Sequence, residues 1–347
     1  MFNIFKVTFV IIGTIIGAGF ASGQEIYTFF NRFGFYGLIG LIFSLLFISI
    51  IIYKTLKISL ENNINIYQDF VEKIIPNKLK TNKILILSIT NIINLFLLIS
   101  FNIMAAGFST YFFQEFNLSK IIGGLIIAII SFITFSKSLN GVIKINTYLI
   151  PTLLILIVFL GFKKINGIET IKNQQSVYWI ISSILYASYN SICLIPILIS
   201  LKEYLKTKRD AILVSVTTFI IMIILSLTIF LLLNSQVDKI SKIEIPIVYI
   251  ASTLGSFVKH VYGICILIAI FTTAVSSGYS FLKNNANSYK KYIKLALIIC
   301  IISIPVSGFS FSSLISILYP VFGYLGILQI FFLLTAWKNN TGLIYNM

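Results

Sequence analysis

Ten long apolar runs dominate this sequence and limit it to one kind of fold. Each run supplies close to the 20 or so apolar residues that an α-helix needs to cross a hydrocarbon core of about 30 Å. Of the 347 residues, 58% are hydrophobic and 10% are charged, whereas soluble domains carry about 25% charged residues. We therefore predict an all-α membrane protein whose single transmembrane domain fills the chain. The ten predicted spans are 4–30, 35–56, 83–111, 119–136, 141–162, 176–202, 208–234, 256–282, 290–308 and 311–337.

The positive charge lies in the connections between these runs. The formal net charge is +16, from 26 lysines and arginines against 10 acidic residues. An even number of spans places both termini on one side, and 18 of the 26 basic residues then fall on that side. Since basic residues accumulate in cytoplasmic segments, we expect a multi-pass protein of a bacterial cell membrane with both termini in the cytoplasm. No basic run alternates with aromatic platforms, so a nucleic-acid partner is not expected.

The spans divide into two sets of five, residues 4–162 and 176–337, that share one pattern. In each set the first span contains small and polar residues, and a long connection follows the second span. We expect a short helix in each connection, near 66–73 and near 245–254. Because each set has five spans, the two sets enter the membrane from opposite sides. Inverted repeats with interrupted first helices are typical of secondary transporters that bind their solute near the membrane midplane.

Four glycines, at positions 13, 17, 19 and 23, interrupt the first span. Glycine weakens a helix interior by about 0.5–1 kcal/mol relative to alanine, and non-helical backbone is tolerated at membrane depth only where protein or a watery cavity surrounds it. We therefore predict a break near 17–23, where free N–H groups suit a carboxylate and free carbonyls suit a cation. The alternative is that these GxxxG spacings serve only close helix packing.

The sixth span carries a matching interruption. Residues 187–191 read ASYNS, and Pro196 follows one turn later. Serine and asparagine side chains compete for backbone hydrogen bonds, and proline removes one. We expect a second break here, the alternative being a continuous helix kinked at the proline.

Residues 12–20, IGTIIGAGF, resemble the first-helix GxxxGxG signature of the amino acid–polyamine–organocation superfamily. Residues 21–25, ASGQE, with the two phenylalanines at 29 and 30, resemble the YkvI-like membrane proteins of Gram-positive bacteria. The layout of ten spans is similar to the LeuT-type fold, a 5+5 inverted repeat with discontinuous first and sixth helices. The resemblance implies that amides near Ala18 and Gly19 face a substrate carboxylate, and that carbonyls of Gly13 and Ile16 face a cation.

In sodium-coupled proteins of this type, a small residue and two adjacent hydroxyls on the eighth span complete the cation site. Residues 269–273, AIFTT, fit that pattern, and residues 273–277, TAVSS, resemble it one turn later. Hydroxyl and carbonyl oxygens form a suitable shell for a hard cation. Alternatively, these hydroxyls bond back to their own helix. The residues expected at a sodium site are Gly13, Ile16, Thr272, Thr273, Ser276 and Ser277; no other cofactor is expected.

Glu25 is the one acidic residue within a predicted span of the first repeat, and acids at membrane depth are usually functional. It could carry a proton, gate the outer path or bind a substrate amine. Alternatively, its only role is structural, because an acidic side chain in the first turn of the outer half-helix interacts favourably with the N-terminus of that helix. Asparagines of the third span lie on a helix that lines the path in the resembled fold. The residues expected to bind solute are Gly17, Ala18, Gly19, Phe20, Gly23, Glu25, Asn94, Ser188, Tyr189 and Asn190.

Together these features predict a secondary active transporter that takes up a small amino-acid-like solute with Na⁺ or H⁺ by alternating access. Its partners would be the solute and the lipid bilayer. The alternative is a membrane nutrient receptor that binds its ligand without net transport. An enzyme is not expected, because the 10 acidic residues and one histidine form no clustered acid–base pair and no metal-binding motif.

Overall fold

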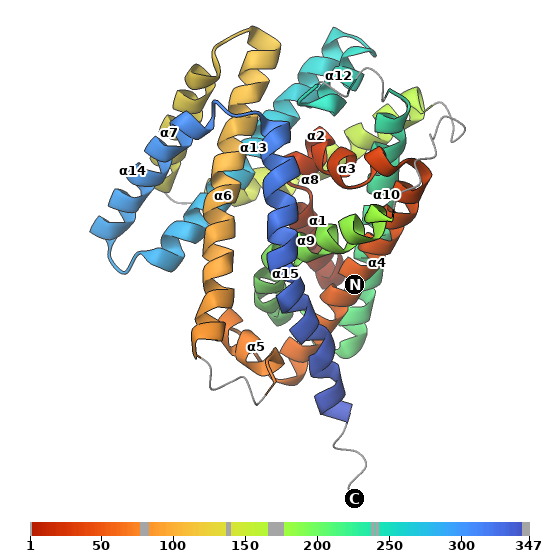
Figure 1. The fold of residues 1–347 in the computed structure, drawn as a ribbon, viewed down its shortest axis with the longest axis vertical. Helices are drawn as coiled ribbons and strands as arrows, with labels where there is room; N and C mark the ends of the chain where they lie inside the picture. The colour runs from red at the N-terminus through yellow and green to blue at the C-terminus, as the bar shows by residue number, and fades with distance from the viewer. Residues whose placement is uncertain are drawn as a thin grey trace, which may run out of the picture.

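The computed structural model describes residues 2–76, 83–136, 140–165, 177–236, 240 and 243–341, and every regular element among them is a helix (Figure 1). All ten predicted runs are helical. The first comprises three short helices described below. The others are α4 (Gly34–Glu61), α6 (Lys83–Phe116), α7 (Lys120–Phe135), α8 (Asn140–Lys164), α9 (Tyr178–Leu201), α10 (Lys208–Asn234), α13 (Ser256–Asn285), α14 (Tyr289–Val306) and α15 (Phe311–Thr341).

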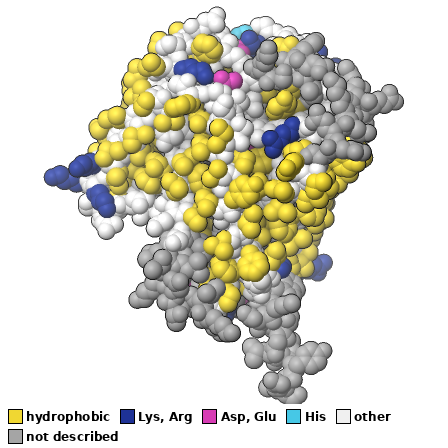
Figure 2. Space-filling view, in the orientation of Figure 1, with side chains coloured by type: hydrophobic (Ala, Val, Ile, Leu, Met, Phe, Trp, Pro, Cys, Tyr) yellow, Lys and Arg dark blue, Asp and Glu magenta, His cyan; other side chains and the backbone are white. Residues whose placement is uncertain are grey.

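Within the described residues, six helical stretches are long and apolar enough to cross a membrane. The membrane-embedded class of the chain is thus confirmed. The count of ten spans and the inverted repeat remain predictions. Hydrophobic side chains also cover most of the described part of the face in Figure 2. Large apolar side chains lie at this protein's surface, among them Ile155, 69% exposed, and Phe162, 86% exposed. Lipid rather than water suits such a surface.

Both predicted short helices are present. Helix α5 (Tyr67–Ile74) follows α4, and α12 (Pro246–Ser252) precedes α13. They lie at opposite ends of the molecule in Figure 1. Helix α5 buries Phe70, Val71 and Ile74, which explains its amphipathic sequence, because one face packs on the protein while the other carries polar residues.

The first segment is broken as the glycines predict. It consists of α1 (Phe2–Ile15), α2 (Ala18–Ser22) and α3 (Gln24–Phe29), after which a short 3₁₀ turn (Asn31–Phe33) leads into α4. Helices α6, α7, α13 and α14 pack on one another, and α1, α4, α9 and α10 form a second group (Figure 1). The two short helices α2 and α3 lie between them, because α2 contacts α13 while α3 contacts α9 and α10.

The predicted break in the sixth span is wrong. Helix α9 is one continuous helix that includes Pro196. Its polar side chains bond back to their own helix: the Asn190 amide donates to the Tyr186 carbonyl at 2.9 Å, and the Ser191 hydroxyl to the Ser188 carbonyl at 2.6 Å. These bonds leave the helical path intact. Of the two spans predicted to be interrupted, the first and the sixth, only the first is interrupted.

Candidate functional site

The break in the first helix releases a backbone carbonyl. The N–H of Gly17 donates to the carbonyl of Ile15 at 2.9 Å, whereas in a continuous helix it would donate to Gly13. Gly17 itself is extended, with φ −82° and ψ −178°. At the far end of α2, Gly23 has φ +86°, a left-handed conformation that favours glycine. The two glycines therefore delimit a short helical piece with its own direction.

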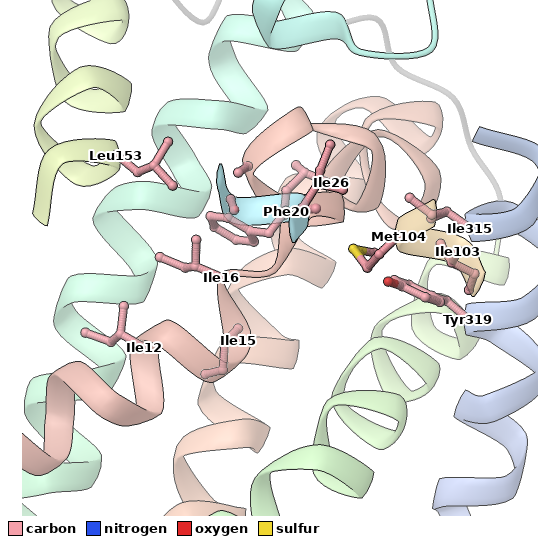
Figure 3. Close-up of a cluster of buried hydrophobic side chains, with 14 of the residues drawn as sticks. Ile12, Ile15, Ile16, Phe20, Ile26, Ile103, Met104, Leu153, Ile315 and Tyr319 are labelled. Atoms are coloured by element: carbon pink, nitrogen blue, oxygen red, sulfur yellow. The ribbon is translucent and has the colours of Figure 1, made fainter. Parts of the chain in front are cut away.

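The broken segment is enclosed by protein. All five residues of α2 are buried, and Gln24 and Glu25 are each 3% exposed. Figure 3 shows Phe20, Ile16 and Ile26 clustered at the break, with Tyr319 on the side of α15. This enclosure meets the requirement that non-helical backbone at membrane depth be surrounded by protein.

Side chains of other helices satisfy the carbonyls near the break. The Tyr262 hydroxyl of α13 donates to the Ala21 carbonyl at 2.7 Å, and the Ser182 hydroxyl of α9 donates to the Phe29 carbonyl at 2.7 Å. Such cross-links supply partners that the interrupted helix itself lacks. The break is therefore held in place by both groups of helices.

The side chain of Glu25 turns back over α2. The Tyr189 hydroxyl of α9 donates to its Oε2, and the backbone amide of Phe20 interacts with the same carboxyl group. The three atoms nearest to a Cβ built on Gly19 all belong to Glu25. The protein's own carboxyl group thus lies against Gly19 and the Phe20 amide, in the region where a substrate carboxylate was expected. Close packing between helices does not explain the glycine at position 19.

Aromatic rings surround this carboxyl group. Tyr189 stacks on Phe29 with ring centroids 5.6 Å apart and on Tyr319 at 4.8 Å. Tyr186 meets Tyr189 edge to face at 5.4 Å. We call these four residues with Glu25 the aromatic cluster. Sequence reasoning found Tyr189 and Glu25 but missed the other three. The spacing of Tyr186 and Tyr189, three residues apart on one helix face, was an available signal; Tyr319 comes from α15 and offered none.

The other solute-site candidates lie at different distances from the break. Ser188 and Asn190 are buried on α9 next to the aromatic cluster, and the Ser188 hydroxyl has no hydrogen-bond partner among the described residues. Asn94 lies elsewhere, because its Oδ1 accepts from the Asn284 amide at 2.8 Å. Asn284 is eleven residues beyond Thr273 on α13, which is about 16 Å along the helix axis. The structure does not bring Asn94 to the break.

The hydroxyls of α13 differ in their relation to the break. Thr273 Cγ2 lies 3.9 Å from a Cβ built on Gly17, so this turn of α13 faces the break. Buried Thr272 donates to the Ala269 carbonyl at 3.2 Å. One turn later Ser277 donates to Ser100 of α6 at 3.2 Å, and Ser276 is exposed. Of the two hydroxyl pairs, Thr272 and Thr273 are the one next to the interrupted backbone. Buried Ile16 lies at the break itself, directly before Gly17.

A segment that includes α12 covers the C-terminal part of the broken helix. The Gln24 side-chain amide donates to the carbonyls of Ile243 and Glu244 at 3.0 and 2.9 Å. The Glu244 carboxylate in turn accepts from Lys120 Nζ at 3.1 Å and from the Phe311 N–H at 2.6 Å. We call residues 243–252 the cover. It joins α3 to the N-termini of α7 and α15, and no local sequence pattern indicated this link.

A cavity of about 380 Å³ lies beside the cover. Its lining includes Thr110, Glu115, Glu244, Tyr249 and Lys259. Lys259 pairs with Glu115 at 2.7 Å. The described structure therefore has a hollow beside α12 with both polar and apolar side chains in its lining, while α2 is buried.

The chain is similar over nearly its whole length to two proteins of one bacterium. It is 26% identical over 336 residues to the uncharacterized membrane protein YkvI of Bacillus subtilis (strain 168), covering 93% of this chain and 92% of that protein. It is 27% identical over 338 residues to the uncharacterized protein YyaD of the same organism, covering 94% and 96%. No protein-family model matches the chain. These similarities agree with a membrane protein and name no function.

Proposed function

We propose that this protein is a secondary transporter that carries a small amino-acid-like solute across a bacterial cell membrane with a coupled cation. The observation that carries the proposal is the enclosed break of the first helix, where a carboxyl group, aromatic rings and released backbone meet inside the bundle. Interrupted helices and acidic residues at membrane depth are costly, and they mark solute and ion pathways.

The break offers oxygen atoms for a cation. The Gly13 carbonyl loses its helical N–H partner to the bond between Gly17 and Ile15. The Thr273 methyl group approaches Gly17, which places the side chain that carries this hydroxyl next to the break. We propose that Na⁺ binds here, held by carbonyls of Gly13 and Ile16 and hydroxyls of Thr272 and Thr273, because hard cations prefer oxygen ligands. The solute would bind on the other side of the break, next to Glu25.

Alternating access needs two bodies that move and a path that opens to one side at a time. The two groups of helices would be the moving bodies, arranged in the proposed ten-span inverted repeat with both termini in the cytoplasm. The cover bonds to α3 through Gln24 and to α7 and α15 through Glu244. In this conformation it closes the outer path, and opening would break these bonds.

Uptake into proteoliposomes tests the proposal. Purified protein is reconstituted, a Na⁺ or H⁺ gradient is imposed, and accumulation of labelled amino acids and related amines is measured. We expect gradient-driven accumulation that Gly19→Leu and Glu25→Gln abolish and that Glu61→Gln leaves intact; Glu61 pairs with Lys208 at the far end of α4. Saturable binding with no gradient-driven accumulation would instead indicate a membrane receptor.

A further inference from the structure

The aromatic cluster combines a carboxyl group with the faces of several rings, and these groups favour the same kind of ligand. Glu25 lies in it with 3% exposure, and Tyr186, Tyr189 and Phe29 are at most 5% exposed. None of the ion pairs in the described part of the chain involves Glu25. A carboxylate in such surroundings is costly unless a positive charge joins it.

From this juxtaposition we infer that the site recognises the ammonium group of a small organic amine, and that a carboxylate on the ligand is not what it binds. The inference rests on the proposed function and narrows its amino-acid-like solute to a small amine without an α-carboxylate. An ammonium group is attracted both by the Glu25 carboxylate and by the faces of aromatic rings, which carry partial negative charge. Phe29, Tyr189 and Tyr319 stack in one row beside that carboxylate, so the ring faces that an ammonium group can approach are the outer ones of Phe29 and Tyr319.

The arrangement disfavours an anionic ligand group at the same place. The carboxyl group of Glu25 already contacts the backbone of α2 at Phe20, and it occupies the space next to Gly19. A second carboxylate brought to these amides has to displace it or lie beside it. Repulsion between two like charges about 4 Å apart, at an effective dielectric constant near 20, lowers the affinity for such a ligand roughly a thousandfold. An amine without an α-carboxylate avoids that loss.

The cluster also contains groups that can orient an ammonium group. The Tyr186 hydroxyl is buried within it and has no hydrogen-bond partner in the described structure. An ammonium group donates up to three hydrogen bonds, so it can give one to Glu25 and another to a hydroxyl. A protonated primary amine therefore matches the cluster better than a quaternary one, which donates none.

Matched ligand pairs test the inference on the full chain without any mutation. Binding of leucine and its decarboxylated analogue 3-methylbutylamine, and of phenylalanine and phenethylamine, is measured by thermal shift and calorimetry in detergent. We expect each amine to bind at least tenfold more tightly than its parent amino acid. Equal or tighter binding of the amino acids, or no binding by any amine, would overturn the inference.

Two variants then locate the site. Glu25→Gln should weaken amine binding at least tenfold, whereas Glu61→Gln, which removes an acid from an ion pair on α4, should leave it unchanged. Amine binding that survives Glu25→Gln would contradict the inference. Stabilisation by protons alone, dependent on Glu25 and with no amine binding, would show that the residue carries a proton instead. Amine binding without gradient-driven uptake would reject the transporter and keep the inferred ligand class.

Discussion

Replacing Gly19 with alanine probes the contact between the break and Glu25 directly. A Cβ at this position would lie 2.9 Å from Glu25 Cγ and 3.0 Å from Cδ, and it would overlap Oε1. Overpacking of this kind costs about 1–3 kcal/mol. Displacing the carboxyl group from the Tyr189 hydroxyl adds about 1–3 kcal/mol for a buried group that loses its partner. The helical preference of alanine returns about 0.5–1 kcal/mol, so we expect a net loss of roughly 1–5 kcal/mol.

Gly17→Ala is the matched control, since it lies two residues away in the same break. The nearest atom to a Cβ there is Thr273 Cγ2 at 3.9 Å, and the extended backbone at Gly17 suits any residue. We expect this variant to stay within about 0.5 kcal/mol of the parent protein or to gain slightly. Thermal unfolding in detergent should therefore separate the two variants by several degrees.

A double-mutant cycle completes the test. In a Glu25→Ala background the side chain that collides with the new Cβ is absent, so Gly19→Ala should lose most of its effect. The coupling between the two changes should be about 1–3 kcal/mol. Equal losses for Gly19→Ala in both backgrounds, or equal losses for the two glycine variants, would refute the assignment of Gly19 to the Glu25 contact and support helix packing instead.

Three further predictions concern the cation, the cover and the packing of α9. Thr273→Ala should lower Na⁺-driven uptake at least tenfold, and Ser276→Ala should not, because Thr273 faces the break while Ser276 is exposed; uptake with Na⁺ replaced by choline checks this. Gln24→Glu keeps the shape of the side chain but removes both donors to the cover, so unfolding should show a loss of about 1–3 kcal/mol; unchanged stability would mean that these bonds do not hold the cover. Gly326→Ala places a Cβ against the backbone carbonyl of Ser188, which cannot rotate aside, so a loss of about 1–3 kcal/mol is expected in the same assay, and a neutral result would contradict the tight α9–α15 contact.

Local sequence patterns predicted those parts of the fold that depend on neighbouring residues. Ten apolar runs gave ten helical segments, and the amphipathic run near 66–73 gave α5. The glycines predicted the break, because Gly23 takes a left-handed conformation and Gly17 an extended one. The same reasoning was wrong for α9. Its serine and asparagine side chains donate to carbonyls of their own helix. Such side chains can also bond in ways that interrupt a helix, and only the packed structure shows which of the two occurs.

The sequence by itself determined that the chain is a membrane protein, that its first helix is interrupted and that an acidic residue follows the interruption. These properties depend on hydropathy and on backbone preference over a few residues. Tertiary structure alone decided where that acid points. Its carboxyl group folds back onto α2 because Gly19 leaves room and because α9 supplies a tyrosine hydroxyl from 164 residues away. Tyr319 and the cover likewise come from distant segments, and contacts of that range follow from packing rather than from local pattern.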